Sequence, residues 1–217
     1  MLTDYQRFFT ARPTTTIAQD LLGRLLIYDG PQGRLGGWIV ETEAYLGVND
    51  SASHAANGRR SNYSESLYGH PGDIYLYQIR GHFCFDIVTQ AAGEPQGILI
   101  RGLEPVLHPE IMAANRHQNG PNVSNGPAKL VAALGIHSRA LDGQPMATSP
   151  LFVDLAQRQV PTAITTTARI GMNPTGKDSA APRRFYVTGN PYVSGMKKRA
   201  MDLTHHGWQV AAKNDDA

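Results

Sequence analysis

The sequence predicts an α+β fold: a single mixed domain built on a curved antiparallel sheet, with a β-hairpin that protrudes from it. Runs typical of β-strands follow one another across Gly-rich turns, and the few helical segments are short and irregularly spaced. This mixed order differs from the regular strand–helix alternation of α/β proteins. The chain has 217 residues, 41% of them hydrophobic, which suits one large domain with a buried core. We expect that domain to span residues 1–217, with an ordered core at about residues 15–200.

The first predicted elements are one helix and two strands. Threonine is a preferred N-cap, so the threonines that precede an apolar run predict a helix over residues 14–22. Gly23 either ends this helix or starts a strand. Strands are predicted at residues 25–28 and 37–45, because a Gly-rich turn separates the two runs. A polar loop region follows at residues 47–73.

The next two β-like runs, residues 74–79 and 83–88, predict a β-hairpin. Only Arg80, Gly81 and His82 lie between them, and glycine in a three-residue connection is a hairpin signal. The tip of this hairpin would therefore carry a cation and an imidazole.

The rest of the chain alternates irregularly between predicted strands and helices. A helix is predicted at residues 105–114, and another at residues 127–134, which has a proline at its first position and a glycine directly after it. The start of the second helix, residues 125–127, is a possible anion-binding helix end. The remaining predicted strands are residues 97–101, 151–153 and 184–187.

The strand at residues 37–45 has the most unusual side-chain pattern. Alternation places Ile39, Glu41, Glu43 and Tyr45 on one face. Acidic residues are depleted in strands and are rarely buried unless they are paired. A carboxylate that a rigid strand holds beside an aromatic ring is a good general base for activating water. The alternative is that both glutamates are solvated or form ion pairs with arginines.

Charge and histidine content narrow the function classes. The net charge is only +2, so no global field indicates nucleic acid. Residues 169–199 contain seven basic residues and one acid, Asp178, a local excess that suits phosphate contact, although a solvated surface is the alternative. The eight histidines show no ligand spacing such as H-E-x-x-H, so we expect no metal.

Cys84 is the only cysteine, so no disulfide forms within the chain and we expect a reducing, intracellular location. It lies in an apolar run, which favours a buried structural thiol over a nucleophile. The N-terminal residues lack the apolar region of a signal peptide, and no apolar run reaches 18 residues. We therefore expect no membrane partner.

Seven motifs occur in order within about residues 17–195: residues 40–47, 54, 71–77, 99–105, 126–130, 168–171 and 184–191. Together they resemble the alkyladenine (3-methyladenine) DNA glycosylase family, of the alkylpurine DNA N-glycosylase type. The resemblance implies a single-domain, monofunctional enzyme that flips alkylated or otherwise damaged purines out of duplex DNA and hydrolyses the N-glycosidic bond. This reaction would start base excision repair. It implies double-stranded DNA that contains damaged purines as the partner, no cofactor, and a monomer.

The resemblance also assigns roles to individual residues. Glu43 would be the general base that activates water, which Arg101 and the carbonyl of Ile170 would help to hold. The residues that would stack on and hydrogen-bond the extruded base are Tyr45, His54 and Tyr77. The residues that would contact DNA phosphates are Arg59, Lys129 and those at the start of the 127–134 helix.

Elementary chemistry agrees with this family. Breaking a glycosidic bond passes through an oxocarbenium-like state, so a nearby carboxylate both stabilises positive charge and deprotonates water. Alkylated purines are often cationic, and the electron-rich faces of Tyr45 and Tyr77 attract cations. The bond is inaccessible inside the base stack, which makes flipping necessary. A positively charged hairpin formed by Arg80, Gly81 and His82 is suited to insertion into a minor groove.

Two positions depart from the family pattern. The family usually has an aromatic residue at the hairpin tip, where this chain has Arg80, and we expect the planar guanidinium to fill the gap that the flipped nucleotide leaves. The family usually has asparagine in the pocket where, after a one-residue gap, Asp86 falls. Asp86 either lines the pocket and reads the base, or faces away and pairs with Arg80 or His82 across the hairpin.

Two other function classes remain open. The first is a noncatalytic nucleic-acid-binding module on the same scaffold. Such a module would lack the general base or the arginine that holds the water, yet Glu43 and Arg101 are both present. The second is a hydrolase of free nucleosides. The hairpin and the basic residues 169–199 argue against it, because a small substrate needs neither.

Overall fold

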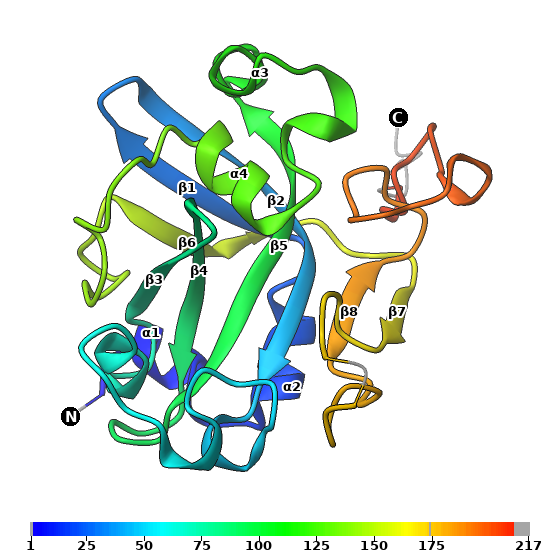
Figure 1. The fold of residues 1–217 in the computed structure, drawn as a ribbon. Coiled ribbons are helices and arrows are strands. Elements are labelled where there is room, and N and C mark those ends of the chain that lie inside the picture. The colour runs from blue at the N-terminus through cyan, green and yellow to red at the C-terminus, as the bar shows by residue number, and fades with distance from the viewer. Residues whose placement is uncertain (1, 174, 211–217) are drawn as a thin grey trace.

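Eight strands form one sheet in the structure, a computed structural model that describes residues 2–173 and 175–210. The strand order is β3-β4-β5-β2-β1-β6, with β8 added to β2 and β7 to β8, and every pairing is antiparallel (Figure 1). The predicted α+β domain on an antiparallel sheet is confirmed. The strands are β1 (Arg24–Gly30), β2 (Gly33–Tyr45), β3 (Ile74–Ile79), β4 (His82–Thr89), β5 (Gln96–Leu107), β6 (Leu151–Arg158), β7 (Ile164–Thr167) and β8 (Arg184–Val187).

Short helices pack against this sheet. They are α1 (Asp4–Phe8), α2 (Thr14–Asp20), α3 (Pro109–Arg116) and α4 (Pro127–Ala133). Helix α2 lies against β2, β5 and β8, and α4 lies across β4 and β5, at the end of the sheet where α3 is also found (Figure 1). Within the described part of the chain, no helix has the length and apolar character that a membrane span requires.

Side chains of β3 alternate between two hydrophobic clusters. Ile74 and Leu76 belong to the large core that also holds the apolar face of α2. Tyr75 and Tyr77 point to the opposite face and join a smaller cluster with Cys84. Both tyrosines are therefore buried, and the smaller cluster becomes the floor of the pocket described below.

The helix predicted at residues 105–114 begins later than expected. Strand β5 continues through Pro105 to Leu107, and α3 starts only at Pro109. The extra residues of β5 pair with the start of β2, where a Cβ on Gly37 would lie 2.1 Å from the carbonyl oxygen of Glu104. Since glycine lets the two backbones approach this closely, pairing extends the strand past the proline.

The β3–β4 hairpin is present, but its connection is shorter than predicted. His82 pairs with Ile79 as the first residue of β4, which leaves Arg80 and Gly81 as a two-residue turn. Their φ angles are 50° and 84°. Positive φ at both central positions is what a tight hairpin turn requires, and glycine adopts it without strain.

The packed core also extends before residue 15. Phe9 is fully buried, and α1 precedes it with a capping box between Thr3 and Gln6. That motif is readable in the sequence as a threonine followed three residues later by glutamine. The short strand β7 is absent from the predicted elements; it forms because its backbone pairs with β8.

Candidate active site

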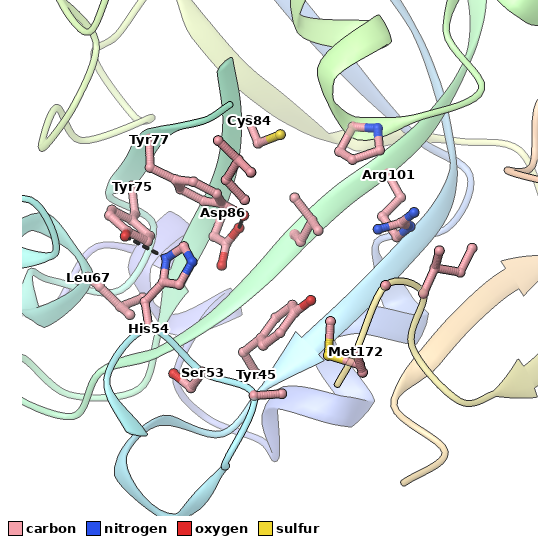
Figure 2. Close-up of a pocket in the computed structure, with 16 residues that line it drawn as sticks. Tyr45, Ser53, His54, Leu67, Tyr75, Tyr77, Cys84, Asp86, Arg101 and Met172 are labelled. Carbon is pink, nitrogen blue, oxygen red and sulfur yellow. Dashed lines mark hydrogen bonds between the residues drawn. The ribbon is translucent and has the colours of Figure 1, made fainter. Parts of the chain in front are cut away.

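A cavity of about 260 Å³ opens on the face of the sheet that carries the smaller hydrophobic cluster. Strands β2, β3, β4 and β5 form its floor, and the segments around Ser53 and Met172 close its sides (Figure 2). Aromatic and apolar side chains dominate the lining and a few polar groups converge on it, as is typical of ligand sites. The sequence-predicted residues that line it are Tyr45, His54, Tyr77, Asp86, Arg101 and Ile170.

Glu43 lies fully buried behind one wall of this cavity, where three groups donate hydrogen bonds to its carboxylate. The backbone amide of Ile170 donates to Oε1 at 2.7 Å, and the hydroxyl of Tyr45 donates to Oε2 at 2.8 Å. Nη1 of Arg101 lies 3.4 Å from Oε2. Burial raises the pKa of Glu43 above its ordinary value of 4.5, although these three donors oppose the shift. A raised pKa brings a carboxylate nearer to the ideal for a general base.

Glu41 has a different set of partners from Glu43. Its Oε1 accepts from Nε of Arg184 at 2.6 Å and from Nε of Arg101 at 3.3 Å, and its Oε2 accepts from the backbone amide of Ser194 at 2.7 Å. Neither glutamate is solvated, so that alternative is wrong for both. The ion pairs with arginines exist, and they tie Glu41 into the structure more completely than Glu43.

An aromatic group forms the opposite side of the cavity. The ring of His54 lies edge-on to Tyr77 with 4.8 Å between centroids, and its Nδ1 is 2.8 Å from the hydroxyl of Tyr75 (Figure 2). Burial, with a smaller contribution from Arg59, lowers the pKa of His54 below 6.5. A neutral imidazole between two tyrosines offers both a flat surface and a ring nitrogen to a ligand.

Asp86 also lines the cavity, where Figure 2 shows its carboxylate close to Tyr77 and His54. The hydroxyl of Tyr77 donates to Oδ1 at 3.0 Å. Neither Arg80 nor His82 forms an ion pair with it in the part of the chain that the structure describes; both are exposed at the hairpin turn. The hairpin-pairing alternative is therefore wrong, and Asp86 belongs to the pocket.

Comparison with known proteins agrees with this geometry. The family model for methylpurine-DNA glycosylase (MPG) matches residues 8–191. The chain belongs to the methylpurine-DNA glycosylase family. It is thus a DNA glycosylase, a DNA-repair hydrolase that acts on N-glycosyl bonds, and its substrate is DNA.

Curated relatives match over nearly their whole length. A protein of Latilactobacillus sakei subsp. sakei (strain 23K), named "Putative 3-methyladenine DNA glycosylase", is 54% identical over 93% of this chain and 95% of its own length. Proteins with the same name from Lactobacillus delbrueckii subsp. bulgaricus and Staphylococcus saprophyticus subsp. saprophyticus are 47% and 43% identical. These two matches cover 94% and 93% of this chain, and 99% of each relative.

The residues predicted to contact DNA lie on several elements of this glycosylase. Arg59 is exposed near His54, and Lys129 lies on α4, two residues after Pro127, which lines the cavity. The Nζ of Lys129 is 2.7 Å from Oδ1 of Asn125. Arg80 is exposed at the hairpin turn, next to Ile79, which also lines the cavity. Their contact with DNA stays a prediction.

The basic segment at residues 169–199 is not one surface patch. Arg169 and Arg184 are buried, and they pair with Asp50 and Glu41. Arg183 also lies 3.1 Å from Asp50. The interpretation of the whole segment as a phosphate-binding surface is therefore wrong for these three arginines. The exposed basic residues that remain are Lys177, Lys197, Lys198 and Arg199.

Sequence reasoning missed the ion pair between Arg169 and Asp50. Both side chains are fully buried, with nitrogen–oxygen distances of 2.6 and 2.8 Å. The guanidinium also donates to the carbonyl of Ala44 and lies 4.5 Å from the ring centroid of Tyr45. This pair therefore fixes the segment that presents Ile170 to Glu43. The motif at residues 168–171 contains Arg169, but nothing in the sequence points to Asp50 as its partner.

No three histidine, cysteine, aspartate or glutamate side chains come together as a metal-binding group in residues 2–173 and 175–210. Cys84 is buried, and burial raises the pKa of its thiol to about 12. A thiol with so high a pKa is a poor nucleophile.

Proposed function

We propose that this glycosylase flips a damaged purine out of duplex DNA into the cavity beside Glu43 and hydrolyses the N-glycosidic bond with a water that Glu43 activates. The observation that carries the proposal is the Glu43 carboxylate itself. It is buried and held by donors from three different segments, and all three donor residues, Tyr45, Arg101 and Ile170, line the cavity. The names of the relatives favour 3-methyladenine as one of the bases released.

In this proposal the water attacks the anomeric carbon of the sugar while Glu43 accepts its proton. The base leaves with the electron pair of the broken bond. A cationic alkylpurine becomes neutral as it leaves, so its departure requires no protonation. The negative carboxylate also stabilises the positive charge that develops on the sugar.

Tyr45 and Arg101 would have to control access to this carboxylate. The Tyr45 hydroxyl donates a hydrogen bond to Oε2 of Glu43 in the structure. A bound nucleobase must therefore shift the phenol before water can donate to this oxygen. Arg101 stays fixed between Glu41 and Glu43 and can orient the water. The carbonyl of Ile170 would serve as a second acceptor for the same water.

A monofunctional mechanism fits the composition of the cavity. Bifunctional catalysis would need an amine to form a Schiff base with the sugar. Among the described residues that line the cavity there is no lysine.

The direct test is a base-release assay with the wild-type protein on duplexes that each contain one lesion. The panel is 3-methyladenine, 7-methylguanine, hypoxanthine and ethenoadenine, with undamaged duplex as the control. We expect release of at least one damaged base with the DNA backbone left uncut, and retarded migration of duplex DNA in a gel shift. Release from free nucleosides without binding to duplex would contradict the proposal.

A further inference from the structure

We propose that Asp86 selects the base that this pocket accepts: its free carboxylate oxygen takes a hydrogen bond from the base, which favours cationic alkylpurines with an exocyclic amine, such as 7-methylguanine, over neutral hypoxanthine. The inference rests on the proposed function, because it assigns a substrate preference to the same pocket.

Asp86 is held in position but only half of its carboxylate is used. It lies in β4 between Tyr75 on β3 and Leu99 on β5, and its exposed fraction is 5%. The Tyr77 hydroxyl donates to Oδ1, and no described residue donates to Oδ2. Since Asp86 lines the cavity and Oδ2 is not sealed from it, this oxygen is an acceptor that a ligand can reach.

The neighbouring strand places a glycine next to this oxygen. Gly97 lies on β5 beside Asp86, and a Cβ on Gly97 would lie 3.2 Å from Oδ2. Any side chain at position 97 would therefore crowd the carboxylate. Glycine avoids this contact, and the side chain that lies there is Leu67, whose Cδ1 would be 3.1 Å from the same Cβ.

Among the residues that the structure describes, no cation forms an ion pair with this carboxylate. Arg101, a cation that lines the cavity, is bound to Glu41 and Glu43. Burial raises the pKa of Asp86 to about 7, against the opposing effect of the Tyr77 hydroxyl. An unpaired buried carboxylate is unfavourable, so a cationic base would supply the charge that the protein does not.

The chemistry of the acceptor sets the direction of the preference. The positive charge of a cationic base lowers the pKa of Asp86 from about 7 and so favours its ionised form. An ionised carboxylate can only accept hydrogen bonds, whereas an amide at the same place would also present a donor. 7-Methylguanine in DNA is positively charged and carries an exocyclic amine. Hypoxanthine is neutral and lacks that amine, so it gains less from Asp86.

The test is the ratio of single-turnover excision rates for 7-methylguanine and hypoxanthine in the same duplex sequence. Asp86→Asn keeps the shape and an acceptor for Tyr77 but removes the charge, and we expect the ratio to fall about tenfold or more, as for loss of a hydrogen bond to a charged group. Asp73→Asn is the matched control, because Asp73 is also buried with a raised pKa but does not line the cavity. An unchanged ratio in Asp86→Asn, or an equal fall in Asp73→Asn, would overturn the inference.

A second measurement separates this inference from the proposed function. Binding of 7-methylguanosine and of inosine to the wild type, Asp86→Asn and Asp86→Ser is measured by NMR titration, which requires no base release. We expect the wild type to prefer 7-methylguanosine and both variants to lose that preference. Asp86→Ser serves in place of Asp86→Asn if Asp86→Asn does not fold. If the wild type released no base from any duplex, the proposed function would be wrong, and the binding preference would still decide the role of Asp86.

Discussion

At the scale of single residues, Glu43 and Asp86 are two buried carboxylates beside the same cavity. Their hydrogen-bond partners differ. Glu43 accepts from an amide, a hydroxyl and a guanidinium, whereas the Tyr77 hydroxyl is the one donor to Asp86 among the described residues. The environment of Glu43 suits an ionised general base, and that of Asp86 leaves a hydrogen-bond acceptor available to a ligand. Paired titratable groups with contrasting environments commonly divide two roles between them.

The hydroxyl of Tyr45 should tune the pH dependence of base release. It donates to Glu43 and thereby lowers the pKa of that carboxyl, so Tyr45→Phe should raise it. Since Glu43 must be ionised to act as the general base, the acid limb of the pH–rate profile should move to higher pH. Tyr75→Phe is the matched control, because the Tyr75 hydroxyl contacts His54 instead of Glu43. The pH dependence of kcat/KM reports the free enzyme, in which this hydrogen bond exists, and measures both midpoints; an unmoved midpoint in Tyr45→Phe would exclude this role.

Asp86 should also make stability depend on pH. Its pKa is about 7 in the folded protein against an ordinary value of 3.8, so the fold favours the protonated form. That stabilisation is complete below about pH 4 and is lost as the pH rises through about 7. It amounts to as much as about 4 kcal/mol. Urea unfolding at pH 4.5 and pH 8 should show that Asp86→Asn gains stability relative to wild type at the higher pH; a pH-independent difference would show that Asp86 titrates normally.

At the scale of secondary-structure elements, the β3–β4 hairpin joins the pocket to an exposed turn. Its Tyr77 and Asp86 line the cavity, and Arg80 is exposed at its end. The outer edge of β3 is held by other segments: the amide of Gln78 donates to the Tyr63 hydroxyl at 2.6 Å, and the amide of Leu76 donates to Asp142 at 2.9 Å. A supported edge keeps the hairpin from moving independently of the pocket.

Arg80→Ala should reduce excision from duplex DNA more than from single strands. The planar guanidinium can stack in the gap that the flipped base leaves, and single strands contain no stack that must be held open. We expect a loss of roughly fivefold or more on duplex, which corresponds to a stacking contact of about 1 kcal/mol. Excision rates on matched duplex and single-stranded substrates give the comparison, with His82→Ala as the neighbouring control. Equal losses on both substrates would show that Arg80 does not fill the gap, and His82 would become the candidate.

How far the sequence predicts these elements depends on whether local pattern or tertiary pairing decides them. Strand alternation alone puts Glu43 on one face with Tyr45, and Tyr75 on one face with Tyr77, and the structure has both pairs together. The end of β5 differs from the prediction because Pro105 suggests a helix start, while pairing with the glycines of β2 decides the outcome. The partnership of Asp50 with Arg169 joins positions 119 residues apart, and no local pattern encodes it.

At the scale of the whole molecule, a net charge of +2 conceals a division between buried and exposed cations. Three buried arginines form ion pairs with carboxylates and so organise the site: Arg101, Arg169 and Arg184. Other cations, such as Arg59 and Arg80, are exposed. Sequence alone could count these residues but could not sort them, because burial depends on the complete fold.

Binding to duplex DNA should weaken steeply with salt, because neutralised phosphates release counterions. Arg59→Ala and Lys129→Ala should each reduce the magnitude of the salt slope by about one if each residue neutralises one phosphate. Arg34→Ala is the control, because Arg34 is exposed on the β1–β2 hairpin and pairs with Asp29. Fluorescence anisotropy over a series of salt concentrations measures the slopes. Affinity that is indifferent to salt would exclude phosphate contacts by this protein.

The most direct test of the catalytic proposal is single-turnover base release by Glu43→Gln, with DNA binding measured on the same preparation. The amide keeps the shape of the side chain but cannot accept the proton of the water, so release should fall at least about 100-fold, the lower end for loss of a general base, while binding persists. Glu41→Gln, which alters a carboxylate held by Arg184 and Ser194, should lose much less. Release by Glu43→Gln at the wild-type rate, or a greater loss in Glu41→Gln, would contradict the assignment of Glu43 as the general base.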